Sequence, residues 1–231
     1  MQNLNVLFED NHIIVVEKPV NIPSQGDKTG DVDMLSIIKQ YLKEKYNKPG
    51  DVYLGLVHRL DRPTGGVMVF ARTSKAASRL SEQVRNKEFK KKYLAIVDGK
   101  LEADSGEFVD YLYKNEKTNT SRIAKKDEKN AKEAKLNYKV IKYDEEINLS
   151  VVEVELQTGR HHQIRVQFAS RGHSLYGDQK YGTRGRGKQL CLWAYYLSFI
   201  HPVTKEVLEF KLEPEHTRKL ENIGLKSAKP L

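Results

Sequence analysis

The sequence has one cysteine and no long apolar stretch, and both shortages exclude whole classes of protein. Cys191, alone among 231 residues, excludes an internal disulfide framework and a zinc site built from several cysteines. No apolar run approaches the ~20 residues of a membrane-spanning helix. Residues 1–10 also lack the basic start and apolar core of a signal peptide. We therefore expect a cytoplasmic protein that does not enter a membrane.

Histidines are few and do not fall on metal-ligand spacing. His161, His162, His173 and His201 have no cysteine cluster to join them, so we expect no metal site. With 39% hydrophobic and 31% charged residues, the chain is typical of a folded protein that can bury one large core. We expect a single domain over residues 1–231, acting as a monomer without an obligate protein partner.

Positive charge is in excess. The 40 lysines and arginines outnumber 31 acidic residues, which gives a net charge of +9 and a pI near 9.3. Such an excess favours a polyanionic partner, because each neutralised phosphate releases counterions. Residues 114–135 hold eight basic and four acidic side chains and are expected to form an exposed hairpin or loop. A solvated surface gives the same pattern, so charge alone leaves both interpretations open.

The most informative segment is His-Arg-Leu-Asp-Arg-Pro-Thr-Gly-Gly, residues 58–66. It places the carboxylate of Asp61 between two arginines, and its proline and glycines indicate a loop between buried strands at residues 52–57 and 67–71. An arginine beside a carboxylate favours the ionised form, which a nucleophile or an electrostatic stabiliser requires. The alternative is that Asp61 only accepts hydrogen bonds from turn amides, as loop aspartates often do.

Strand-like segments outnumber helical ones along the chain. Helices are predicted after the N-cap residues Asp33 and Thr73, and a short one at residues 217–223. Further strands are predicted at residues 4–8, 12–16, 92–97, 136–140, 149–156, 190–200 and 207–212. Helices fall between some strands without a regular βαβ rhythm. The pattern favours an α+β fold with a mixed, mainly antiparallel sheet and covering helices.

Two further segments carry candidate functional residues. After Gly159, a predicted helix would begin at Arg160 and carry Arg165 one turn further on. An arginine held there can pair with a buried carboxylate in a bidentate fork, although a surface arginine that packs its stem fits equally well. Tyr93 follows three lysines into a strand, where a tyrosine can stack on a base, donate a hydrogen bond or shuttle a proton. An ordinary strand tyrosine is the alternative.

Together, these segments resemble the RluA-type family of RNA pseudouridine synthases. The matching segments occur in the family's order: Ile-Ile-Val-Val-Glu-Lys-Pro at 13–19, His-Arg-Leu-Asp at 58–61, Lys-Tyr-Leu-Ala-Ile-Val-Asp-Gly at 92–99, Thr-Gly-Arg-His-His-Gln-Ile-Arg at 158–165, and Gly-His through Gly-Asp to Tyr-Gly at 172–182. One such match could arise by chance, but five in order cover most of the chain. The resemblance implies the catalytic fold of that family.

The resemblance also implies an activity: isomerisation of specific uridines in ribosomal or transfer RNA to pseudouridine, without cofactor or metal. Asp61 would act at the sugar, by covalent attack at C1′, by stabilising positive charge there or by assisting deprotonation at C2′. Arg165 would hold Asp61, and Tyr93 would stack on the uracil and take the proton from C5. The target nucleotide would be flipped out of its stack, with Arg59 filling the vacated space. Other RNA-binding residues implied are His58, Lys90, Lys91, Lys92, Arg160, Arg184 and Arg186.

Four residues depart from the family pattern. Gly65 stands where serine is usual, Gln167 and Trp193 where histidine is frequent, and Leu175 where proline is common. None is a catalytic candidate, so the departures bear on the shape of the RNA groove and not on the chemistry. Many relatives also carry an N-terminal RNA-binding domain of the S4 type. Because the matching pattern starts within the first dozen residues, we expect no such domain here.

Two other classes of function remain. A nucleoside glycosidase would also use an aspartate near an anomeric carbon, but it would usually need a second carboxylate, and we expect none at this site. An RNA-binding protein without chemistry could use the same basic surface. Asp61 counts against it, because a pure binder gains little from a carboxylate where phosphates gather.

Overall fold

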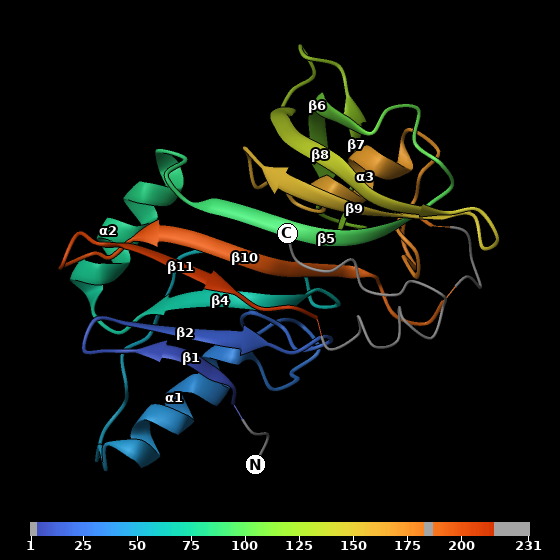
Figure 1. The fold of residues 1–231 in the computed structure, drawn as a ribbon. Helices are drawn as coiled ribbons and strands as arrows, with labels where there is room; N and C mark the ends of the chain where they lie inside the picture. Colours follow the sequence, from blue (N-terminus) through green and yellow to red (C-terminus); the bar gives the residue numbers. More distant parts are fainter. Residues whose placement is uncertain (1–3, 183–186, 215–231) are drawn as a thin grey trace.

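The apolar runs and alternating segments of the sequence form strands that join edge to edge in the computed structural model, which describes residues 4–182 and 187–214 (Figure 1). Within this part of the chain, all strands belong to one sheet. The strands are β1 (Val6–Glu9), β2 (Ile13–Lys18), β3 (Gly55–Leu56), β4 (Gly65–Ala71), β5 (Lys90–Asp98), β6 (Ser105–Asn115), β7 (Thr120–Ala124), β8 (Lys132–Asp144), β9 (Leu149–Leu156), β10 (Leu192–Ile200) and β11 (Val207–Lys211).

The strand order is β1-β2-β4-β10-β5-β9-β8-β6-β7, with β11 beside β10 and β3 beside β4. Neighbours are antiparallel except β4 and β10, which pair in parallel at Gly65 and Gly66. Figure 1 shows β5 and β10 running through the middle of the molecule, so that they join its two ends. The predicted α+β fold with a mixed, mainly antiparallel sheet is confirmed.

Two predicted helices cover opposite faces of the sheet. Helix α1 (Met34–Lys45) starts where the Asp33 side chain accepts the amide of Ser36, and helix α2 (Ser74–Arg85) where Thr73 accepts the amide of Ala76. The apolar side of α1 packs with Ile14 and Val16, whereas that of α2 packs with Ile13 and Val15. Because neighbouring residues of a strand point to opposite faces, the two helices close the sheet from both sides.

Three sequence expectations need correction. The buried strand predicted at residues 52–57 is a strand only at Gly55–Leu56, and the rest of that apolar run is irregular. Strand β6 was not predicted, although it and β7 form the hairpin expected around residues 114–135. The helix predicted from Arg160 starts later, as α3 (Gln163–Ala169) with His162 at its N-cap. The short helix predicted at 217–223 lies outside the described residues.

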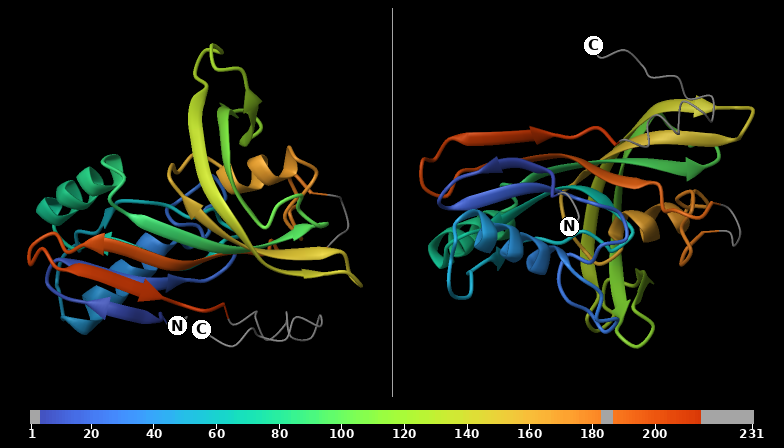
Figure 2. Two further views of the ribbon diagram at one scale, coloured as in Figure 1. Left: turned by 45° about the horizontal axis from the view of Figure 1, so that its top comes forward. Right: turned by 90° about the horizontal axis from the view of Figure 1, so that it is seen from below.

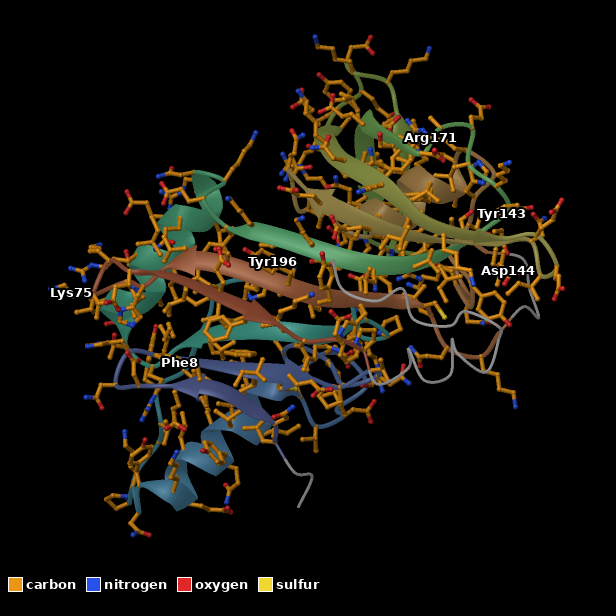
Figure 3. All side chains as sticks on the ribbon, in the orientation of Figure 1. Phe8, Lys75, Tyr143, Asp144, Arg171 and Tyr196 are labelled. Atoms are coloured by element: carbon orange, nitrogen blue, oxygen red, sulfur yellow. The ribbon has the colours of Figure 1, made fainter. Side chains whose placement is uncertain are left out.

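Helix α3 lies beside β6 and β7, where the long strands β6 and β8 rise away from the centre (Figure 2). Its Phe168 contacts the ring of Phe108 edge-on. At its C-terminal end Arg171, labelled in Figure 3, forms an ion pair of 3.0 Å with Asp110 of β6. These contacts fix the helix so that its first turn faces the loop that carries Asp61.

Candidate active site

The loop around Asp61 is held through its backbone. Lys18, which is fully buried, donates hydrogen bonds to the carbonyl oxygens of Pro19 at 2.9 Å, Arg62 at 3.0 Å and Thr64 at 2.7 Å. Three acceptors match the three protons of an ammonium group, while burial lowers the pKa of Lys18 to about 7. The lysine thus fixes the residues on both sides of Pro63 through their carbonyl oxygens.

The Asp61 carboxylate does not serve the turn in which it lies. The turn is closed by the amide of Thr64, which donates to the backbone oxygen of Asp61 at 2.9 Å. The carboxylate oxygen Oδ2 instead lies 3.3 Å from Nη1 of Arg165 and 3.7 Å from Nε2 of His162. With 27% of the Asp61 side chain exposed, the group is both paired and reachable. The geometry argues against the turn-amide alternative.

Arg165 is anchored by a second carboxylate, Asp178. Its Nε and Nη2 each donate to Asp178 at 2.7 Å, in the bidentate fork that the sequence suggested. Both side chains are almost fully buried, at 4% and 0% exposed. Burial opposes the charge of Arg165, but the hydrogen bonds and charge of Asp178, and then of Asp61, raise its pKa above the usual value. Arg165 therefore presents its remaining nitrogen, Nη1, to Asp61.

Asp178 corrects the expectation that no second carboxylate lies at the site. Besides Arg165, it accepts the backbone amides of Lys180 at 2.9 Å and Tyr181 at 3.1 Å through Oδ1. A carboxylate that is buried and bonded in this way is not free to activate water. Asp178 lies in the last of the matching motifs, but its residue type and position there indicate no role. The signal was available, because a buried arginine needs more than one hydrogen-bond acceptor.

Tyr93 lies in the central strand β5, and 6% of it is exposed. Burial raises the pKa of its phenol well above the usual value, and the negative charge of Asp61 raises it further. Its hydroxyl therefore keeps its proton at neutral pH. Asp61, whose charge contributes to this shift, in turn lies 3.3 Å from Arg165.

Two of the suggested RNA-binding residues form contacts away from Asp61. His58 fills the gap between β3 and β10 along one edge of β4, where its Nε2 accepts the amide of Val69 at 3.1 Å. Lys92 neighbours Tyr93 in β5 and so points to the opposite face of the sheet, where it forms an ion pair of 3.0 Å with Glu153. Neither geometry places the side chain beside Asp61.

The arginines of these segments differ in their exposure and in their partners. Arg59 is exposed, and Arg160 is exposed with its Nε donating to the carbonyl of Glu133 at 2.8 Å. Arg62, for which the sequence suggested no role, pairs with Asp31 and lies 3.8 Å from Asp27, so it ties the loop at residues 21–31 to the Asp61 loop. Arg184 and Arg186 lie outside the described residues.

The described part of the chain gives no sign of a metal centre or a membrane span. Across residues 4–182 and 187–214, histidine, cysteine, aspartate and glutamate side chains form no group of three or more suited to a metal ion. In the same residues, every helix is too short or too polar to cross a bilayer.

Comparison with known proteins gives the class. The family model described as RNA pseudouridylate synthase matches residues 12–170. A protein of Aquifex aeolicus named an uncharacterized RNA pseudouridine synthase is 34% identical over 229 residues, which cover 94% of this chain and 71% of that protein. The ribosomal large subunit pseudouridine synthase D of Zymomonas mobilis is 32% identical over 224 residues, covering 91% of this chain and 69% of the relative.

The chain therefore belongs to the RNA pseudouridylate synthase family, and it is an isomerase that acts on RNA. The resemblance seen in the sequence is confirmed. A solved structure agrees on the fold: human RNA pseudouridylate synthase domain containing 4 superposes with a TM-score of 0.80 at 22% identity, covering 96% of this chain and 94% of that chain.

Proposed function

We propose that the protein converts uridine to pseudouridine in large-subunit ribosomal RNA, with Asp61 acting at the sugar. The observation that carries this proposal is the sharing of Arg165. Asp178 fixes the guanidinium through two bonds of 2.7 Å, and the remaining nitrogen meets a carboxylate that is 27% exposed. The choice of RNA rests on relatives whose names specify the ribosomal large subunit; transfer RNA is the other substrate to be tested.

The reaction sets demands that this site is suited to meet. The N1–C1′ bond of uridine breaks, the base turns while held, and C5 bonds to C1′. The proton lost at C5 balances the one gained at N1, so atoms and electrons balance without a cofactor. Because these atoms are hidden in a stacked helix, the nucleotide must be flipped out, at a cost of a few kcal/mol. Arg59, exposed beside the Asp61 loop, is the side chain that we assign to the vacated space.

Three routes remain for the carboxylate of Asp61: covalent attack at C1′, stabilisation of positive charge there, or assistance to deprotonation at C2′. Each requires an ionised carboxylate held in one orientation. The ion pair with Arg165 at 3.3 Å supplies both requirements, and Lys18 fixes the loop behind it. In this proposal Asp61 carries out the chemistry, whereas Asp178 only holds Arg165 in position.

Tyr93 is assigned to the uracil. Only 6% of Tyr93 is exposed in the free protein, so the flipped base must displace neighbouring groups before it stacks on the ring, a contact worth about 1–3 kcal/mol. The phenol of Tyr93 is protonated in the free protein. It can therefore accept the proton from C5 only if its own proton is transferred to another group at the same time. The carboxylate whose charge acts on Tyr93 is that of Asp61, which becomes available again once C1′ has bonded to C5.

RNA binding without chemistry is a weaker account of the same residues. A pure binder would neutralise or bury a carboxylate at a phosphate-binding surface, whereas this chain buries the supporting Asp178 and exposes Asp61. A glycosidase is disfavoured because the second carboxylate is fully bonded. Since one sheet joins all described strands, we also propose that the chain acts as one catalytic domain.

The experiment is chemical mapping of pseudouridine across total RNA from cells with the gene, without it, and with Asp61→Asn in its place. We expect pseudouridine at one or a few large-subunit uridines with the wild-type gene only. Sites confined to transfer RNA would overturn the choice of substrate. An unchanged map in the absence of the gene would overturn the proposed function itself.

A further inference from the structure

Tyr181 lies between the β6–β7 hairpin and the first turn of α3. Its hydroxyl oxygen accepts the backbone amide of Ser121 in β7 at 2.7 Å and lies 2.7 Å from Nδ1 of His162. The face of its ring also lies 5.2 Å from the guanidinium of Arg165. One side chain thus connects the hairpin with two residues that contact Asp61.

The direction of these hydrogen bonds fixes the proton of His162. An amide nitrogen only donates, so the bond from Ser121 uses a lone pair of the Tyr181 oxygen. The phenolic proton is then directed to Nδ1 of His162. A neutral imidazole carries one proton, which must therefore sit on Nε2. Burial, and next the charge of Arg165, lower the pKa of His162 to about 2, so the ring is neutral at physiological pH.

His162 adopts a backbone conformation that supports a specific role. Its φ of 54° lies in the left-handed region, which non-glycine residues rarely adopt. It occupies the N-cap of α3 but makes no side-chain capping bond, although an N-cap residue usually provides one. The ring instead stacks on that of His161 at 3.7 Å and points its nitrogens at Tyr181 and Asp61.

Both contacts of the carboxylate involve the same oxygen. Nη1 of Arg165 and Nε2 of His162 both face Oδ2 of Asp61, at 3.3 and 3.7 Å. We propose that His162, with its proton fixed on Nε2 by Tyr181, is a positioning residue that holds Oδ2 together with Arg165, so that Oδ1 is the oxygen that acts on the ribose. At 3.7 Å the pair is too long for a hydrogen bond, so the proposal requires this separation to shorten when RNA binds. This proposal rests on the role proposed above for Asp61.

The effect should fall on turnover and not on RNA affinity, because His162 is buried and its Nε2 faces Asp61. A hydrogen bond to a charged group corresponds to about 10- to 100-fold in rate. We therefore expect Tyr181→Phe and His162→Asn to lower kcat by about 10- to 100-fold, with KM changed less than about twofold. His162→Gln carries an amide that reaches the place of Nε2, and it should recover most of the loss.

Tyr143→Phe is the matched control. Tyr143 lies at the far end of β8, as Figure 3 shows, and its hydroxyl donates to Asn148 at 3.0 Å. It should retain wild-type kcat and KM. Equal kcat in Tyr181→Phe, His162→Asn and wild type would overturn the proposal.

A second measurement is independent of activity. Nitrogen-15 NMR of labelled histidine distinguishes the two neutral tautomers, and we expect His162 to show the Nε2–H form from pH 5 to 8, with a mixed population in Tyr181→Phe. The groups that face this ring are Asp61, His161, Arg165, Tyr181, Lys114 and Lys180. An Nδ1–H tautomer in the wild-type protein would overturn the proposal even if pseudouridine forms. Absence of pseudouridine with the Nε2–H tautomer present would instead count against the proposed function.

Discussion

Arg165 donates two hydrogen bonds of 2.7 Å to Asp178, in a pair that is almost completely buried. The same guanidinium reaches the partly exposed Asp61 at 3.3 Å. The site therefore holds two carboxylates on one arginine, with different tasks. Asp178 fixes the position of Arg165, and Arg165 orients the carboxylate of Asp61.

The two carboxylates should differ in their effect on stability. Asp178→Asn leaves the buried charge of Arg165 without its main partner, so we expect a loss of about 3–5 kcal/mol in the free energy of unfolding. Asp61→Asn breaks a longer, partly exposed pair and should cost about 1 kcal/mol or less. Urea unfolding followed by circular dichroism measures both. Equal losses in the two variants would contradict the assigned division of tasks.

Lys18 should be as important for folding as any residue of the core. Lys18→Met leaves the carbonyl oxygens of Pro19 and Thr64 without this donor, whereas that of Arg62 still accepts the amide of Asn21. Because an unsatisfied buried group costs about 1–3 kcal/mol, we expect a loss of about 2–3 kcal/mol in the free energy of unfolding, with reduced turnover because the Asp61 loop loosens. Lys75→Met is the control, since Lys75 is exposed on α2 (Figure 3). A Lys18→Met protein as stable as this control would show that the three bonds contribute nothing.

Acid should destabilise the protein partly through His58. Burial, and next the charge of Lys91, lower the pKa of His58 to about 3 from 6.5. As the pH falls, His58 is protonated in the unfolded chain before it is protonated in the folded protein. The contribution of neutral His58 to the free energy of unfolding is therefore complete above pH 6.5 and is lost as the pH falls toward 3. His58→Gln retains an acceptor for the Val69 amide but does not titrate.

Urea unfolding at pH 6.5 and 4.5 tests this linkage. Between these values the wild type should lose about 2 kcal/mol more than His58→Gln. If both proteins lose the same free energy, the buried histidine does not contribute to acid sensitivity.

Gly65 and Trp193 depart together from the family pattern, and they touch. They are paired across β4 and β10, and a Cβ at position 65 would overlap the indole ring. Gly65→Ser alone should therefore lower the free energy of unfolding by about 1–3 kcal/mol. With Trp193→His in the same chain the serine gains space, so the double variant should be more stable than the sum of the single effects, by about 0.5–3 kcal/mol. Additive losses in thermal unfolding would contradict this coupling.

The sequence could predict those features that depend on neighbours along the chain. Asp33 and Thr73 each bond an amide three residues on, so their helices were found with correct starts. Strand β9 was found because Val152 and Val154 alternate with acidic residues. The strand predicted over the apolar run at 52–57 was too long, because Val52 and Leu54 are buried by packing into the hydrophobic core, while only Gly55 and Leu56 pair in the sheet.

The candidate site was predictable in its chemistry and less so in its geometry. Asp61, Tyr93 and Arg165 were indicated by residue type and family pattern, and the structure places Nη1 of Arg165 3.3 Å from Oδ2 of Asp61. Asp178 was missed because the partner of a buried arginine depends on a contact 13 residues away. Lys92 lies on the face of the sheet opposite to Tyr93, as alternation along β5 requires, so its contact with RNA phosphate stays a prediction.

The most direct test is pseudouridine formation by purified wild-type protein and Asp61→Asn on a large-subunit RNA transcript, measured by mass spectrometry of the digested RNA beside RNA binding of both proteins. Removing the carboxylate at the reacting sugar should lower kcat/KM by about 1,000-fold or more, with RNA affinity within about threefold. Such a result would identify Asp61 as a catalytic residue. Turnover by Asp61→Asn at the wild-type rate would contradict the account.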